Sequence, residues 1–394
     1  MLSFECNLWI HAGKVIYLAM NVPGIFCFFM FFAYVCILNV KKQMSAQRIV
    51  VCGDLEKSVA AVLSGIPHDR LFVLVDAHTS ACCLPSLSSI KEVAEASVLQ
   101  VGAGDAHKGL ESLSQVWSGL SGQGASRHSL LLNVGGGMIT DLGGFAASTF
   151  KRGIHFVNIP TTLLAMVDAA VGGKTGINFN GLKNEVGTFA LADCVLVSTE
   201  FLRTLDEENL LSGYAEMLKH GLISTEKHWA ELLRFDLEDV DYGLLEGLVA
   251  QSIRIKEAIV EKDPHEQGIR KALNLGHTVG HAFESLALER GCPVLHGYAV
   301  AWGIVCELYL SAVRLGFPAD KLRQTVSFIK GHYGMFSFDC HQYDRLYELM
   351  THDKKNEAGR INFTLLRNVG DIAINQQATK EDIFEMLDFY RESN

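Results

Sequence analysis

The stretch LLLNVGGGMITDLGGFAAS, residues 130–148, decides the fold of this chain. An aliphatic run leads directly into three glycines, and a helix-like segment follows them. Glycine has no Cβ, so backbone N–H groups can approach a phosphate closely, and a helix N-terminus adds favourable partial charge for an anion. The glycines do not have the standard GxGxxG spacing. The stretch therefore predicts a strand–turn–helix unit whose turn either binds a pyrophosphate or only reverses the chain tightly.

Similar aliphatic runs recur on both sides of this unit. They are RIVVCG (48–53), LFVLVD (71–76), HFVNIP (155–160) and CVLVS (194–198). Helix-like stretches separate these runs, which predicts a parallel sheet flanked by helices. After about residue 201 the runs nearly vanish and long amphipathic stretches replace them. We expect an α/β domain over 44–200 and an all-helical domain over 201–394, with the site in the cleft between them.

Composition excludes several classes of function. The 394 residues are 49% hydrophobic, and 34 Lys and Arg against 44 Asp and Glu give a net charge of −10. A nucleic-acid-binding surface spread over the protein is therefore not expected, and any basic site must be local. The ten cysteines form no CxxC pair, so neither a disulfide framework nor a cysteine zinc site is indicated. A reducing cytoplasm fits best.

The segment 15–40 is the exception, because it carries no charged residue and is long enough to span a bilayer. Lys41 and Lys42 follow it, and Met44 opens a natural first strand. We favour the interpretation that residues 1–43 are upstream sequence from a misplaced start, and a membrane segment is the alternative. A signal peptide ranks last, since no small-residue cleavage site is clear. Both leading interpretations leave the rest of the chain in the cytoplasm.

The region 148–189 concentrates polar residues among glycines. They are Arg152, Asp168, Lys174, Lys183 and Asn184. Lysines suit recognition of phosphate or carboxylate, and these positions do not have the spacing of a solvated helix face. AVGGKTG lacks the first glycine of a P-loop, so hydrolysis of a nucleoside triphosphate is rejected. Loops that offer lysines to an anion are expected instead. Asp76, at a strand end, either accepts from an NAD ribose hydroxyl or only caps the chain there.

The stretch NLGHTVGHAFES (274–285) places His277 and His281 four positions apart. On a helix both lie on one face, which is the spacing of paired metal ligands. His296 at a helix start and Glu216 in GYAEMLKHG supply further ligand types. Three protein ligands with an open position are typical of catalytic zinc. Spacing alone selects both His277 and His281, but it does not separate a ligand from a neighbouring general base.

Six stretches together resemble the 3-dehydroquinate synthase family. They are NVGGGMITDLGGFAASTFKRGI, PTTLLAMVDAAVGGKTGIN, LKN, GYAEMLKHGLI, LNLGHTVGHAFE and HGYAVAWG, in the family's order over nearly all of 44–394. The resemblance implies that the α/β domain binds NAD, that the helical domain binds substrate and a divalent metal, zinc or else cobalt, and that the protein is a homodimer. It also implies that Glu216, His277 and His296 are the metal ligands. His281 then falls beside the substrate, which revises the assignment from spacing.

The resemblance implies conversion of 3-deoxy-D-arabino-heptulosonate 7-phosphate to 3-dehydroquinate and phosphate, in the shikimate pathway to chorismate and the aromatic amino acids. Transient oxidation by NAD, phosphate elimination, re-reduction and an intramolecular aldol closure make the enzyme a carbon–oxygen lyase. Another sugar-phosphate cyclase and a metal- and NAD-dependent polyol dehydrogenase are the alternatives. A membrane-tethered binding module is a third, and it would leave the polar residues unexplained.

The resemblance also implies the site residues. Around the substrate it places Arg152, Asp168, Lys174, Lys183, Asn184, Lys219, Lys256, Arg270, Asn274, His281 and Lys354, the last in preference to Lys355. Around NAD it places Asp76, Asp105, Lys108, Gly135, Gly136, Gly137, Asp141, Thr161, Thr162, Lys174 and Lys183. Three positions depart from the family pattern: Tyr298 stands where Glu is usual, Asp105 where Glu is usual, and His78 where Asn is common.

Overall fold

The computed structural model describes residues 47–351 and 361–392. The segment 15–40, Met44, Lys354 and Lys355 lie outside the described residues. From Gln47 to Asn394 the chain forms one compact unit, so the division into two domains at residue 200 stays a prediction.

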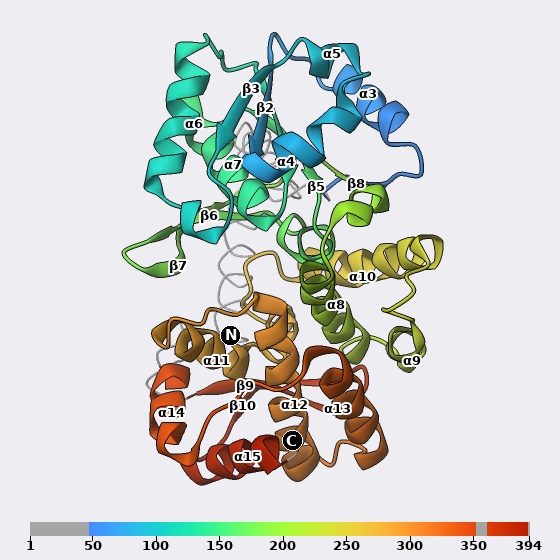
Figure 1. Ribbon diagram of the computed structural model, residues 1–394, viewed down its shortest axis with the longest axis vertical. Coiled ribbons are helices and arrows are strands. Elements are labelled where there is room, and N and C mark those ends of the chain that lie inside the picture. Colours follow the sequence, from blue (N-terminus) through green and yellow to red (C-terminus); the bar gives the residue numbers. More distant parts are fainter. Residues whose placement is uncertain (1–46, 352–360, 393–394) are drawn as a thin grey trace, which may run out of the picture. The chain divides into compact units, whose positions relative to one another are not determined.

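A six-stranded parallel sheet forms the first part of this unit, as predicted (Figure 1). Its order is β1-β8-β5-β4-β2-β3, and the strands are β1 (Ile49–Val51), β2 (Leu71–Asp76), β3 (Ser97–Val101), β4 (Leu130–Gly135), β5 (His155–Pro160) and β8 (Cys194–Val197). Every residue of β2 and β4 is buried, which explains why these strands read as continuous aliphatic runs. β2 and β4 are neighbours, so Asp76 and the glycine turn after β4 share one edge of the sheet.

Helices connect these strands. They are α3 (Leu55–Gly65), α4 (Ala77–Cys82), α5 (Lys91–Ala94), α6 (Leu110–Gly122) and α7 (Gly137–Thr149). The chain runs from β2 to the edge strand β3 and then returns across β2 to β4. In parallel sheets such a reversal of strand order opens a crevice at the carboxyl ends of the strands, where dinucleotides bind. The glycines of 135–137 lie at this reversal.

A hairpin of β6 (Lys174–Phe179) and β7 (Leu182–Phe189) replaces the two lysine-bearing loops that we expected. Asn180 and Gly181 join its strands with positive φ values of 50° and 78°. An Asn-Gly pair between two strand-forming runs is a strong hairpin signal, because both residues tolerate this conformation. The prediction of loops was therefore wrong, although Lys174 and Lys183 still occupy exposed positions on this hairpin.

The second part is helical, as predicted. Its helices are α8 (Glu207–Leu222), α9 (Glu226–Arg234), α10 (Tyr242–Lys262), α11 (His277–Glu289), α12 (His296–Leu315), α13 (Ala319–Tyr333), α14 (Tyr343–Thr351) and α15 (Lys380–Glu392). One antiparallel pair, β9 (Asn362–Asn368) and β10 (Asp371–Gln377), is added to them. The pair buries Phe363, Leu365 and Leu366 of β9 in the core, so this part is not purely helical.

Helix α12 packs so closely against α8 and the start of α11 that backbone atoms are in contact. A Cβ on Gly297 would lie 1.8 Å from the carbonyl oxygen of Ser212 on α8, and one on Gly303 would lie 1.9 Å from the carbonyl oxygen of Gly276. Only glycine allows such an approach. Within the described residues, α12 is also the one helix long and apolar enough to cross a membrane, but 67% of that stretch is buried inside the protein. Burial in the core explains its apolar sequence.

Replacement of Gly297 by alanine is expected to force α12 away from α8. Overpacking a core costs about 1–3 kcal/mol, and backbone cannot yield as a side chain can, so the free energy of unfolding should fall by about 3 kcal/mol. Urea unfolding measures this change. In Gly331→Ala, the matched control on α13, no described atom lies within 4 Å of the new Cβ, so its stability should stay within about 1 kcal/mol of wild type. Equal stability of the two variants would contradict the close packing.

His228 on α9 should make stability depend on pH. It is fully buried, its Nε2 lies 3.3 Å from Ser252 Oγ, and burial lowers its pKa to about 4. The unfolded chain has a histidine pKa of about 6.5, so it binds the proton more readily, and stability falls as the pH drops from about 6.5 towards 4. Between pH 7.5 and 5, wild type should lose on the order of 2 kcal/mol more than His228→Gln in urea unfolding. The same pH dependence in both proteins would refute this.

Candidate active site

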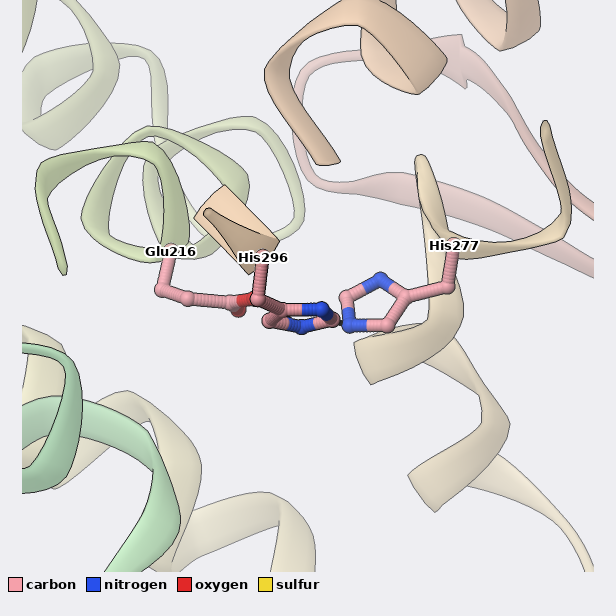
Figure 2. A group of neighbouring side chains, drawn as sticks. All are labelled: Glu216, His277 and His296. Atoms are coloured by element: carbon pink, nitrogen blue, oxygen red, sulfur yellow. Dashed lines mark ion pairs between the residues drawn. The ribbon is translucent and has the colours of Figure 1, made fainter. Parts of the chain in front are cut away.

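Three helices bring Glu216, His277 and His296 together (Figure 2). Glu216 lies on α8 and is fully buried, while His277 and His296 are the first residues of α11 and α12. Glu216 Oε1 is 3.5 Å from Nε2 of His277 and 3.5 Å from Nε2 of His296. Ligand atoms bound to a tetrahedral zinc at about 2.0–2.1 Å are about 3.4 Å apart. The spacing of these atoms therefore fits a metal between them.

Two sets of contacts fix the orientation of His277, one at its imidazole ring and one at the start of α11. Its Nδ1 lies 3.0 Å from the carbonyl oxygen of Leu275, and because a carbonyl only accepts, Nδ1 carries the proton and Nε2 keeps its lone pair. The start of α11 is held by the buried carboxylate of Glu307 from α12, which accepts the N–H groups of Gly276 (2.6 Å) and Thr278 (3.0 Å). These contacts aim Nε2 at Glu216.

The charge state of Glu216 also fits a cation. Burial would raise its pKa, but Lys219 and His296 outweigh burial and hold the pKa below its ordinary value. Its Oε2 pairs with Lys219, whereas Oε1 accepts no hydrogen bond from any described residue. A buried carboxylate oxygen without a donor is costly. A divalent cation bound by one oxygen and two imidazole nitrogens would compensate this cost and keep one position open, as in catalytic zinc sites.

A second trio, His281, Glu284 and His296, also has ligand atoms within reach of one another. The ring of His281 lies 5.4 Å from that of His277 and 5.8 Å from that of His296. All three residues of this trio are only partly buried, whereas Glu216 and His277 of the first trio are buried. The geometry therefore favours the trio around Glu216.

Buried cations surround the neighbouring Asp168. Lys256 Nζ is 2.7 Å and Lys219 Nζ is 3.9 Å from Asp168 Oδ1. Burial would raise the pKa of Asp168, but the two lysines hold it well below its usual range. Arg270, also buried, donates to the carbonyls of Pro264 (2.6 Å) and Gly172 (3.2 Å). An acidic protein thus concentrates positive charge at this point.

Two further networks contain predicted residues. Lys174 pairs with Glu266, which also accepts a hydrogen bond of 2.9 Å from Asn274 Nδ2. Lys108, which is buried, pairs with Asp141 Oδ2 at 2.5 Å and donates to Asn184 Oδ1 at 2.5 Å. Burial raises the pKa of Asp141, and Lys108 opposes this effect. These contacts join the hairpin to α7 on one side and to the helical part on the other.

The glycine turn leaves backbone donors at the start of α7. Gly135 ends β4, Gly136 is the N-cap of α7 and has no side chain with which to cap the helix, and Gly137 is the first residue of α7. The Thr161 N–H donates to the Gly135 carbonyl at 3.0 Å, which brings Thr161 and Thr162 beside the turn. The first N–H groups of α7 suit an anion. Asp76 Oδ1 accepts the N–H groups of His78 (2.8 Å) and Thr79 (2.9 Å), so it caps α4, and its contact to NAD stays a prediction.

Not every predicted residue belongs to these networks. Arg152 lies in the turn after α7 with φ 70°, is exposed, and has no role in the contacts above among the described residues. Sequence reasoning missed Glu284, Glu266 and Glu307. Glu284 follows His277 by seven positions and His281 by three, which places it on the same helix face, and this spacing was an available signal.

Tyr298 does not replace the usual glutamate as a partner of His296. Its ring packs against Tyr333 (centroids 5.2 Å apart) and Trp302 (6.0 Å). Glu284 Oε2 instead lies 3.4 Å from His296 Nδ1. Asp105, the second position that departs from the family pattern, forms an ion pair of 3.5 Å with Lys183. A carboxylate is therefore present beside the histidine, but it comes from α11.

Comparisons with known proteins match this chain over most of its length. The family descriptions "3-dehydroquinate synthase N-terminal" and "3-dehydroquinate synthase C-terminal" match residues 98–212 and 213–356. A 3-dehydroquinate synthase of Parabacteroides distasonis is 60% identical over 350 residues, 89% of this chain and 99% of that protein. One of Campylobacter jejuni subsp. doylei is 37% identical over 81% of this chain and 92% of that protein.

Solved structures share the fold. A 2-epi-5-epi-valiolone synthase from Streptomyces hygroscopicus subsp. jinggangensis 5008, with NAD+ and Zn2+ bound, has a TM-score of 0.79 and 25% identity over 88% of this chain and 97% of that one. A 2-deoxy-scyllo-inosose synthase complexed with carbaglucose-6-phosphate, NAD+ and Co2+ has a TM-score of 0.75 and 22% identity over 87% and 96%.

Proposed function

Because the chain belongs to the 3-dehydroquinate synthase family, we propose that Glu216, His277 and His296 hold its divalent metal and that the cations around Asp168 bind its substrate. The chain is a phosphate-eliminating cyclase of the lyase class. It converts 3-deoxy-D-arabino-heptulosonate 7-phosphate to 3-dehydroquinate and phosphate. The observation that carries the metal site is the position of Glu216 Oε1, 3.5 Å from both histidine Nε2 atoms.

NAD and a divalent metal are the cofactors, and two neighbours of the same fold contain NAD+ with Zn2+ or Co2+. When bound, NAD supplies a transient hydride acceptor and the metal supplies Lewis acidity. The N–H groups after Gly135 would hold the pyrophosphate of NAD, and Thr161 and Thr162 adjoin them. Asp141, four residues after Gly137 and on the same face of α7, pairs with Lys108.

The substrate carries a phosphate and a carboxylate, and buried cations explain how an acidic protein binds it. Lys219, Lys256 and Arg270 are each at most 6% exposed. These cations now contact carboxylates and backbone carbonyls. A phosphate or carboxylate of the substrate would replace these oxygen acceptors with oxygen acceptors of its own. Arg270 is fixed in orientation by two carbonyls, and Asn274 lies four residues further. This pair is suited to the substrate carboxylate, which disfavours a sibling cyclase that lacks one.

His281 is proposed to move a proton at the substrate. Its ring lies beside both histidine ligands yet faces the less buried trio with Glu284. The hairpin of β6 and β7 carries three further proposed substrate contacts, Lys174, Lys183 and Asn184. Arg152 and Lys354 remain proposed substrate contacts without a structural argument. A homodimer in the cytoplasm is also proposed: the cysteine pattern supports the reducing compartment, and the homodimer follows from the resemblance to the family.

The activity should appear in one coupled assay. Protein started at Met44, stripped of metal, reloaded with zinc and given NAD and 3-deoxy-D-arabino-heptulosonate 7-phosphate should release phosphate and 3-dehydroquinate in equal amounts, with no net NADH. Turnover of sedoheptulose 7-phosphate alone would indicate a sibling cyclase. Accumulation of NADH would indicate a dehydrogenase.

The two histidines of α11 should separate metal binding from chemistry. His277→Ala should lose bound zinc and activity together, because it removes one of three ligands. His281→Ala should retain zinc at one equivalent while activity falls by about 10²-fold or more, the usual contribution of a positioned acid or base. Zinc content by elemental analysis is the deciding measurement. Equal zinc loss in both variants would make His281 a ligand.

A further inference from the structure

Glu284 stands at the centre of a chain of charged contacts that reaches the metal site. Its Oε2 lies 3.4 Å from His296 Nδ1, and its Oε1 lies 2.5 Å from Lys183 Nζ. Lys183 in turn lies 3.5 Å from Asp105. The side chain of Glu284 is 12% exposed, whereas those of Lys183 and Asp105 are 52% and 50% exposed. This series of contacts therefore begins at exposed Asp105 and Lys183 and ends at the partly buried His296.

The imidazole of His296 is flanked by two carboxylates. Its Nε2 faces Glu216 and its Nδ1 faces Glu284. A histidine that binds a metal through one nitrogen commonly donates the N–H of the other to a carboxylate or a carbonyl, and this partner fixes the ring and its tautomer. For His277 the partner is the carbonyl of Leu275. For His296 the corresponding position is taken by Glu284.

We propose that Glu284 is a positioning residue, which holds His296 with its proton on Nδ1 and its Nε2 lone pair towards the metal, and that Lys183 fixes the carboxylate in this role. The proposal rests on the metal site proposed above. The two residues of the ion pair are 101 positions apart, so the pair fixes the hairpin of β6 and β7 to α11. Binding of the substrate by Lys183 would then be coupled to the orientation of a metal ligand.

Tyr298 does not supply this partner in this chain. It lies two residues after His296, but its ring is held in the aromatic contacts with Tyr333 and Trp302. Because residue 298 is a tyrosine held in that packing, it gives the imidazole of His296 no carboxylate from α12. Glu284, twelve residues before His296, supplies the charge from α11.

The test is the affinity for zinc, measured by competition with a chromophoric chelator, together with the visible absorption of the protein loaded with Co2+. Glu284→Gln keeps the shape and removes the charge. It should bind one zinc 10- to 100-fold more weakly, the usual effect of removing such a partner, and its Co2+ spectrum should differ from that of wild type. The matched control is Glu289→Gln, on the same helix and in an ion pair with Arg345, which should bind zinc as wild type does.

Three results would overturn the proposal or its premise. Zinc affinity and Co2+ spectrum unchanged in Glu284→Gln would overturn the positioning role alone. Complete loss of zinc in Glu284→Gln, with zinc retained in Glu216→Gln, would make Glu284 a ligand and overturn both. Absence of zinc binding in wild type would overturn the metal site itself.

A measurement on wild type covers the case in which Glu284→Gln does not fold. In zinc-loaded protein labelled with 15N-histidine, His296 should show a slowly exchanging Nδ1–H resonance and a metal-bound Nε2. Metal bound at Nδ1, or an Nδ1 proton in fast exchange with water, would overturn the proposal.

Discussion

The backbone contact of α12 with α8 and α11 is the constraint on which the site depends. Gly297 touches Ser212 of α8, and Gly303 touches Gly276 at the start of α11. Each contact lies next to a proposed ligand: His296 precedes Gly297, His277 follows Gly276, and Glu216 lies one turn after Ser212 on the same face of α8. Glu307 adds a buried carboxylate that holds the first N–H groups of α11. Three helices are thus fixed at the point where their ligands converge.

The electrostatics of the site follow from this burial. Glu216 is fully buried and would be costly as an unpaired charge, so Lys219 and the two histidines surround it. Asp168 is held in its charged form by Lys256 and Lys219. His220, also fully buried on α8, has its pKa lowered to about 3 by burial and by Lys219, so it adds no charge near neutral pH. Anionic and cationic side chains alternate around Glu216 and Asp168, and a phosphorylated sugar acid with a divalent metal would fit this alternation.

The fold was predictable because local patterns determine it. Aliphatic runs that alternate with helix-like stretches predicted the parallel sheet. The hairpin of β6 and β7 was missed, although the Asn180-Gly181 pair is a signal for a hairpin turn. The site was predictable in part. Spacing identified His277 and His281 as a pair, but the choice of His296 and Glu216 as partners depends on how three helices pack, which no local pattern encodes. The spacing of Glu284 from His277 and His281 was an available signal for its helix face, but its partners Lys183 and His296 lie on other elements and could not be read from it.

The assignment of the metal ligands is tested most directly by a crystal structure of the zinc-loaded protein with anomalous diffraction recorded on both sides of the zinc absorption edge. One anomalous peak is expected, at about 2.0–2.2 Å from a carboxylate oxygen of Glu216 and from Nε2 of His277 and His296. A peak bound instead by His281 and Glu284 would contradict the assignment of the ligands and, with it, the roles given to the groups around them.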